Sequence, residues 1–139
     1  MKFNTFIKEK YIKSFLDPIS KDYDLPLYLY HASYKALKED ILERGLRPCQ
    51  KYRSYNWCTN GIYLGVNEQF CVSFLDSGGE ADTNVPEDWY GDYIVFRVLS
   101  TNLNRNRLFR DPNWKVSGES IDSFIYKGII LPNKLEIYE

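Results

Sequence analysis

The stretch Leu27-Tyr28-Leu29-Tyr30-His31-Ala32-Ser33 is an apolar and aromatic run that contains the only histidine of the chain. Short runs of this composition are typical of buried or half-buried β-strands, and we predict a strand over residues 27–31. Further along, Gly61-Ile62-Tyr63-Leu64 predicts a second short strand. A histidine at the end of one strand and a tyrosine in the next can hold a flat ligand, one by hydrogen bonding and the other by ring stacking.

The spacing of apolar residues predicts three helices. They are expected over residues 4–16, 35–44 and 68–75. Ser33 is a candidate N-cap for the second helix, and Gly45 is positioned to end it. The residues expected to face inward are Leu37, Ile41 and Leu42 on the second helix, and Phe70, Cys71, Phe74 and Leu75 on the third.

The second half of the chain is dominated by predicted strands. The strongest pattern is Tyr93-Ile94-Val95-Phe96-Arg97-Val98, and two final strands are expected over 123–131 and 135–138, on either side of Pro132. Segments 47–60 and 76–92 have no clean period and predict loops, the second because of Gly78-Gly79, its acidic residues and Pro86. Together these elements predict an α+β domain.

Length and composition limit the possible classes of protein. A chain of 139 residues is expected to form a single domain. Its net charge of −1 provides no overall field that would attract nucleic acid or a membrane surface. Three cysteines without a Cys-x-x-Cys pair, and one histidine, indicate neither a disulfide framework nor a metal site. The N-terminal residues lack the apolar core of a signal peptide, and no stretch is apolar enough to span a membrane. We therefore expect a soluble, cytoplasmic protein.

The order of these motifs resembles the ADP-ribosyltransferase superfamily, in the His-Tyr branch that includes poly(ADP-ribose) polymerases and diphtheria-type toxins. The segments that carry the resemblance are Tyr30-His31-Ala32-Ser33, Arg44-Gly45-Leu46, Gly61-Ile62-Tyr63-Leu64, Cys71 with Phe74, Ile94–Val98, and Tyr126-Lys127-Gly128 followed by Leu131-Pro132. It is similar above all to small bacterial and phage-borne members. The resemblance begins at about residue 27, so residues 1–26 would be a helical extension. It implies a split β-sheet with flanking helices, and NAD as the substrate.

The resemblance assigns a role to each residue of the first motif. His31 would hydrogen-bond the hydroxyls of the adenosine ribose, and the backbone of Ala32 would hold the nicotinamide carboxamide. Family members have glycine at the position of Ala32, so alanine is tolerable only with an ordinary backbone conformation. Ser33 would add a ribose contact, which is an alternative to its N-cap role.

The other binding residues follow from the second and third motifs. Tyr63 and Phe74 would sandwich the nicotinamide ring, although Phe74 can equally be a core residue of an amphipathic helix. Cys71 occupies the position of a small polar residue in the family, and we expect a buried side chain rather than a reactive thiol. Arg53 lies in the loop that closes over NAD in family members, from where it would reach the pyrophosphate.

The third catalytic position of the family is a glutamate that stabilises the positive charge formed when the glycosidic bond of NAD breaks. Matching Tyr126-Lys127-Gly128 to the bacterial pattern places Ile125 at this position, whereas matching the distance to Leu135 brings Asp122 within reach. We favour Ile125. An isoleucine cannot stabilise a cation, so a carboxylate from the acceptor or from the segment of Glu119 and Asp122 would have to act instead.

These residues predict a mono-ADP-ribosyltransferase that uses NAD to modify a macromolecule, either protein or nucleic acid, without a metal or a membrane partner. One alternative is a catalytically degenerate module of the same fold that binds a nucleotide or a protein. Another is an RNA 2′-phosphotransferase, which shares the fold but relies on a second histidine where this chain has Tyr63. Fold alone does not decide between these functions.

Overall fold

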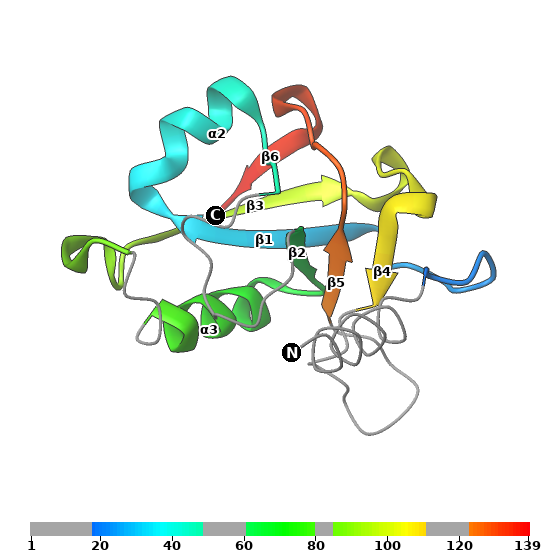
Figure 1. Ribbon diagram of the computed structural model, residues 1–139, viewed down its shortest axis with the longest axis horizontal. Helices are drawn as coiled ribbons and strands as arrows, with labels where there is room; N and C mark the ends of the chain where they lie inside the picture. Colours follow the sequence, from blue (N-terminus) through cyan, green and yellow to red (C-terminus); the bar gives the residue numbers. More distant parts are fainter. Residues whose placement is uncertain (1–17, 49–60, 80–84, 111–122) are drawn as a thin grey trace, which may run out of the picture.

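The computed structural model describes residues 18–48, 61–79, 85–110 and 123–139. The predicted helix over 4–16, most of the predicted loop over 47–60, Arg53, Glu119 and Asp122 lie outside these residues. The strands are β1 (Tyr28–Tyr34), β2 (Ile62–Gly65), β3 (Tyr93–Leu99), β4 (Leu108–Arg110), β5 (Ser123–Tyr126) and β6 (Leu135–Tyr138). The helices are α2 (Lys38–Arg44) and α3 (Glu68–Gly79), with short 3-10 segments at Lys35–Leu37, Glu87–Trp89, Ser100–Asn102, Arg105–Arg107 and Pro132–Lys134. The predicted α+β class is confirmed (Figure 1).

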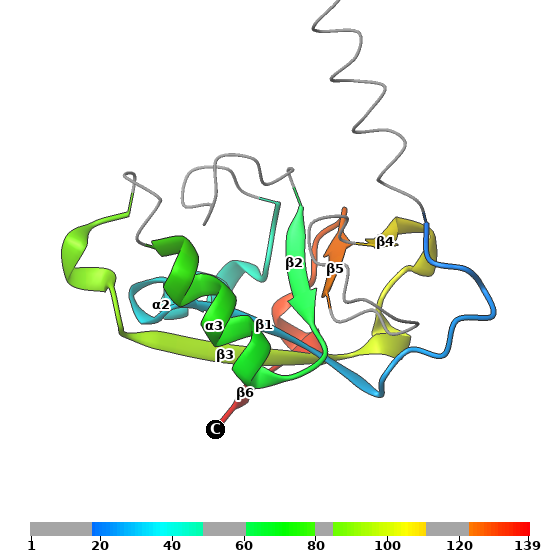
Figure 2. The ribbon, with the colours of Figure 1, turned by 90° about the horizontal axis from the view of Figure 1, so that it is seen from below.

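The six strands of the described chain form one antiparallel sheet in the order β4-β5-β2-β1-β3-β6. β1 pairs with β3 along its whole length, but it pairs with β2 only at Tyr30 opposite Gly65. Beyond this pair the two strands diverge, and Figures 1 and 2 show β2 and β5 running steeply across the direction of β1 and β3. We call this divergence of β1 and β2 the split. It divides the sheet into a β1-β3-β6 half and a β2-β5-β4 half.

Each face of the β1-β3-β6 half is covered by one helix, with α2 on one side and α3 on the other (Figure 1). Successive side chains of a strand point to opposite faces, which explains why Leu29 packs on the α2 side whereas Ala32 and Tyr34 pack on the α3 side. The cluster on the α2 side comprises Ile19, Leu29, Ile41, Leu46, Ile62, Leu64, Phe96, Val98, Leu108, Phe124, Tyr126 and Ile130. The cluster on the α3 side comprises Ala32, Tyr34, Cys71, Leu75, Val85 and Val95.

The connection from β1 to α2 differs from the prediction at its start and agrees with it at its end. Ser33 is not an N-cap, because β1 continues through it to Tyr34 and a 3-10 turn without a side-chain cap leads into α2. Leu42 was expected to face inward but is 41% exposed. Gly45 does end the helix: its φ is +81°, and a Cβ there would lie 2.1 Å from the carbonyl oxygen of Ile130.

The later elements agree with the sequence pattern where the pattern is strong. β3 forms as predicted, whereas β5 ends at Tyr126 instead of continuing to residue 131. β4 was not predicted, because three residues are too few to show an alternation. In the segment predicted as a loop over 76–92, α3 continues to Gly79 and Val85 is buried.

Candidate functional site

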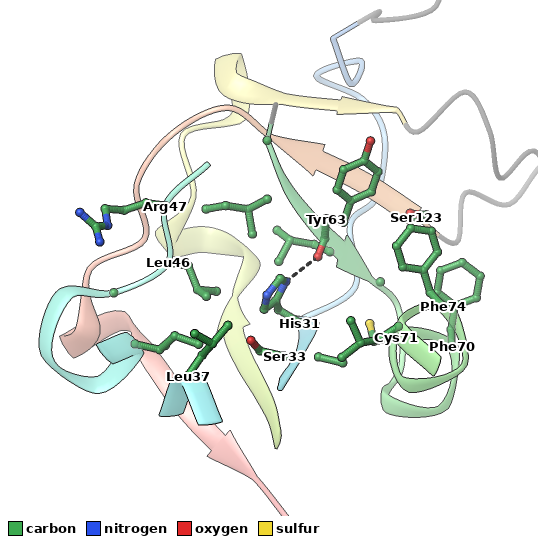
Figure 3. A pocket seen from close by; sticks show the side chains of 18 of the residues that line it. His31, Ser33, Leu37, Leu46, Arg47, Tyr63, Phe70, Cys71, Phe74 and Ser123 are labelled. Carbon is green, nitrogen blue, oxygen red and sulfur yellow. Dashed lines mark hydrogen bonds between the residues drawn. The ribbon is translucent and has the colours of Figure 1, made fainter. Parts of the chain in front are cut away.

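A cavity of about 250 Å³ opens at the split, between the diverging strands and the two helices. Its walls come from β1, β2, the inner face of α3, α2 with the residues that follow it, and the first residue of β5 (Figure 3). The cavity lies where backbone pairing between the two halves of the sheet stops, so both strands can present side chains to the same space.

Six of the residues predicted to form the site line this one cavity. They are His31, Ala32, Ser33, Tyr63, Cys71 and Phe74. They come from β1, β2 and α3, which are far apart in the sequence. Ile125 does not line the cavity, and Arg53 and Asp122 lie outside the described residues.

His31 lies in the middle of the cavity and bridges its two walls (Figure 3). Its Nδ1 is 2.8 Å from the carbonyl oxygen of Tyr63. Because a carbonyl oxygen only accepts hydrogen bonds, Nδ1 must carry the proton, and in the neutral ring Nε2 is then an acceptor. The prediction gave this ring one donor and one acceptor for a ligand, but the donor is already used. A ligand group that pairs with Nε2 must therefore be a donor, such as a hydroxyl.

Burial lowers the pKa of His31 below the ordinary value of 6.5, and the hydrogen bond to the carbonyl of Tyr63 offsets this only in part. The native protein therefore binds fewer protons than the unfolded chain just below pH 6.5. The stability that the neutral ring contributes is complete above this pH and is lost as the pH falls through the native pKa of His31.

We expect the melting temperature of the wild type to fall more steeply than that of His31→Gln between pH 7.5 and 5.5. Thermal unfolding followed by circular dichroism at a series of pH values measures the difference. Since the chain has one histidine, no other imidazole contributes. Parallel curves for the two proteins would show that His31 is not held neutral by its surroundings.

The rings of Tyr63 and Phe74 face each other at the cavity wall. Their centroids are 5.6 Å apart and their planes are inclined by 18°, which is a stacked arrangement. A third ring placed between them needs a centroid separation of about 7 Å, two contacts of about 3.5 Å each. The predicted sandwich therefore requires the two rings to separate by about 1 Å or more, or the ligand ring to stack on one of them.

Cys71 points from α3 into the split, where its sulfur contacts backbone groups of both strands. Its Sγ lies 3.2 Å from the carbonyl oxygen of Tyr30 and also hydrogen-bonds the backbones of Gly65 and Ala32. Burial raises the pKa of the thiol to about 12, although these backbone hydrogen bonds act in the opposite direction. A thiol in this state is a poor nucleophile, as the sequence indicated.

Ala32 and Ser33 complete the β1 side of the cavity. No residue other than glycine has a positive φ in the described chain, so Ala32 meets the condition of an ordinary backbone conformation. Ser33 is 7% exposed and lies beside His31 on the cavity wall (Figure 3). The hydroxyl of Ser33 is therefore at the cavity, and the fold excludes its N-cap role.

Ile125 is fully buried in β5, directly opposite Tyr63. Its Cγ2 is so close to Gly61 that a Cβ on the glycine would lie 2.4 Å away. The space in front of Ile125 is therefore filled. The residue of β5 that does reach the cavity is Ser123, which is two positions earlier on the same face of the strand.

Several residues that line the cavity were not predicted from the sequence. Besides Ser123, they include Asp40 in the first turn of α2, and Leu46 and Arg47 just after the end of this helix. Asp40 forms a salt bridge with Arg44 at 3.4 Å and a looser one with Arg47 at 3.9 Å, and all three side chains are about half exposed. The useful signal was the position of Arg47 two residues after the glycine that ends α2, because the backbone pair of Leu46 with Ile130 fixes this segment beside the cavity.

Neither a metal site nor a membrane-spanning helix is found in the part of the chain that the structure describes. No three His, Cys, Asp or Glu side chains come close enough there to hold a metal ion. None of the described helices has the length and apolar character needed to cross a bilayer. No known family model matches the chain, and no curated protein is significantly similar to it.

Proposed function

We propose that the cavity at the split binds NAD and that the domain transfers single ADP-ribose units from NAD to a macromolecule, with release of nicotinamide. The observation that supports this proposal is the convergence of His31, Tyr63 and Phe74 on one cavity. The same three side chains carry the resemblance of the sequence to the His-Tyr branch of the ADP-ribosyltransferases. The split sheet is also the architecture that the resemblance implies.

The chemistry of the cavity walls is compatible with the parts of NAD. His31 Nε2 accepts a hydrogen bond, as a ribose hydroxyl requires, and Tyr63 offers a ring for stacking. Arg47 supplies a half-exposed cation at the rim, where a diphosphate can reach it. The volume of about 250 Å³ lies just below the range of about 300–1,000 Å³ for small-molecule sites, so part of the dinucleotide would lie outside the cavity.

Breaking the glycosidic bond of NAD builds positive charge on the ribose, which a carboxylate stabilises in glycoside chemistry. Among the described residues that line the cavity, the carboxylate is that of Asp40, and it is engaged with Arg44 and Arg47. We propose that the acceptor or Asp122, the residue before Ser123 in the sequence, supplies this charge instead. Turnover would then be slow and limited to single additions.

Nicotinamide release from NAD tests the proposed reaction. We expect slow release by the wild type, and at least a tenfold loss in Asp122→Ala if this carboxylate stabilises the cation, since such groups are worth about 10²–10³ in rate. Asp88→Ala is the matched control, because Asp88 is exposed and does not line the cavity. Release that is unchanged in Asp122→Ala would assign the charge to the acceptor. Binding of NAD without release by any variant would favour a binding module.

His31→Ala should weaken NAD binding by about 1–2 kcal/mol, because it removes a hydrogen-bond acceptor for the ribose. Calorimetric titration of wild type and variant measures the change. His31→Gln retains a side-chain donor and acceptor and should lose less affinity. If a folded His31→Ala protein binds NAD as tightly as the wild type does, His31 is not a ligand contact.

A further inference from the structure

The backbone pairing between β1 and β2 stops after the pair of Tyr30 with Gly65. Backbone hydrogen bonds of Leu27 with Ser100 and of Lys35 with Asp92 show that odd-numbered residues of β1 direct their polar groups to β3. Even-numbered residues therefore direct theirs to β2, in agreement with the pairing of Tyr30 with Gly65. In this register, the next rung would join Ala32 to Tyr63.

Side chains take over both groups of one of the two hydrogen bonds in that missing rung, the bond from the amide of Ala32 to the carbonyl oxygen of Tyr63. The carbonyl oxygen of Tyr63 accepts a hydrogen bond from His31 Nδ1 at 2.8 Å instead of from the backbone of β1. The backbone of Ala32 hydrogen-bonds the sulfur of Cys71, whose thiol also donates to the carbonyl oxygen of Tyr30 at 3.2 Å. Buried backbone groups without partners are costly, so a split in a sheet persists only when other groups satisfy them.

We propose that His31 and Cys71 are positioning residues that replace the hydrogen bond from Ala32 to Tyr63 and so hold β1 and β2 apart at the cavity. The two side chains approach the split from β1 and from α3, and each satisfies the backbone group that the other does not reach. His31 thus has two roles, since its Nε2 faces the proposed ligand while its Nδ1 holds β2. The split itself is a property of this chain whatever ligand the cavity accepts.

Amide hydrogen exchange of Ala32 tests the role of Cys71. In Cys71→Ala the amide of Ala32 loses its partner, and its exchange relative to Leu29 should accelerate about fivefold to tenfold, as expected for one hydrogen bond. Cys71→Ser, which keeps a shorter donor and acceptor, should restore most of the protection. Leu75→Ala removes apolar packing from the same helix and the same cavity wall but no hydrogen-bond partner of Ala32, so it should not change the exchange rate of Ala32 relative to Leu29. The proposal would be overturned if the exchange rate of Ala32 relative to Leu29 did not change in Cys71→Ala, or if it rose equally in Leu75→Ala.

The tautomer of His31 tests the other half of the proposal in the wild-type protein, without any variant that might fold poorly. Because the chain has one histidine, its two ring nitrogens give an unambiguous ¹⁵N spectrum. At pH 7.5 we expect a neutral ring with the proton on Nδ1, and a ring protonated on Nε2 would contradict the bond to Tyr63. Neither measurement uses NAD, so failure here is distinguishable from failure of the proposed NAD binding.

Discussion

Replacing Ile125 with glutamate is expected to destabilise the domain by about 3–5 kcal/mol rather than to create a catalytic carboxylate. Ile125 is 0% exposed and packs against Gly61, with no space for a longer side chain. A carboxylate there would be buried without a partner, which is among the most damaging substitutions known. The family resemblance alone would lead to the opposite expectation, that glutamate at this position increases the rate of nicotinamide release.

Denaturant unfolding of three variants checks this prediction. Ile125→Val tests packing alone and should cost about 0.5–1.5 kcal/mol. Ser123→Glu places the same carboxylate two residues earlier, on the cavity wall, and should cost less than Ile125→Glu. An Ile125→Glu protein with wild-type stability and faster nicotinamide release would show that this side chain faces the cavity.

Tyr63→Ala should weaken NAD binding by about 1–3 kcal/mol, the usual range for losing a ring that stacks on a base. The substitution should lower the free energy of unfolding by less than it weakens NAD binding. The reason is that Tyr63 belongs to neither hydrophobic cluster and stacks on Phe74 at the cavity wall. Calorimetric titration and denaturant unfolding of the same preparation give the two quantities.

Tyr34→Ala is the matched control for the loss of a tyrosine. Tyr34 is 1% exposed and lies in the cluster on the α3 side, so its truncation should cost about 3–5 kcal/mol in stability. Equal losses of stability in Tyr63→Ala and Tyr34→Ala would mean that Tyr63 is a core residue. Unchanged NAD affinity in Tyr63→Ala would remove its role in stacking.

The elements that the sequence predicted well are those whose pattern has a single physical explanation. β3 is a run of β-branched and aromatic residues that suits a buried strand, and Gly45 is required by a positive φ and by the close approach of Ile130. Ser33 was ambiguous, because serine is common before helices but is also accepted in a strand when the fold buries it. Local sequence does not decide between these environments.

The cavity could be predicted in part from the resemblance, because His31, Tyr63, Cys71 and Phe74 do converge. The choice of Ile125 over its neighbours could not be checked from sequence, since it depends on the register of β5 against β2. Ser123 and Ile125 also share one face of β5, so the alternation of side chains does not separate them, and only the structure shows that Ser123 reaches the cavity while Ile125 is covered. The direct contact of Tyr63 with Phe74 also depends on how α3 packs.

The binding of NAD at the split is tested most directly by titrating the wild-type protein with NAD and following the imidazole resonances of His31. The chain has one histidine, so the signals need no assignment, and Nε2 is the acceptor offered to the ligand. We predict a saturable change in these resonances, with the same dissociation constant as that obtained by calorimetry. If the resonances of His31 do not change even at millimolar NAD, the account is contradicted.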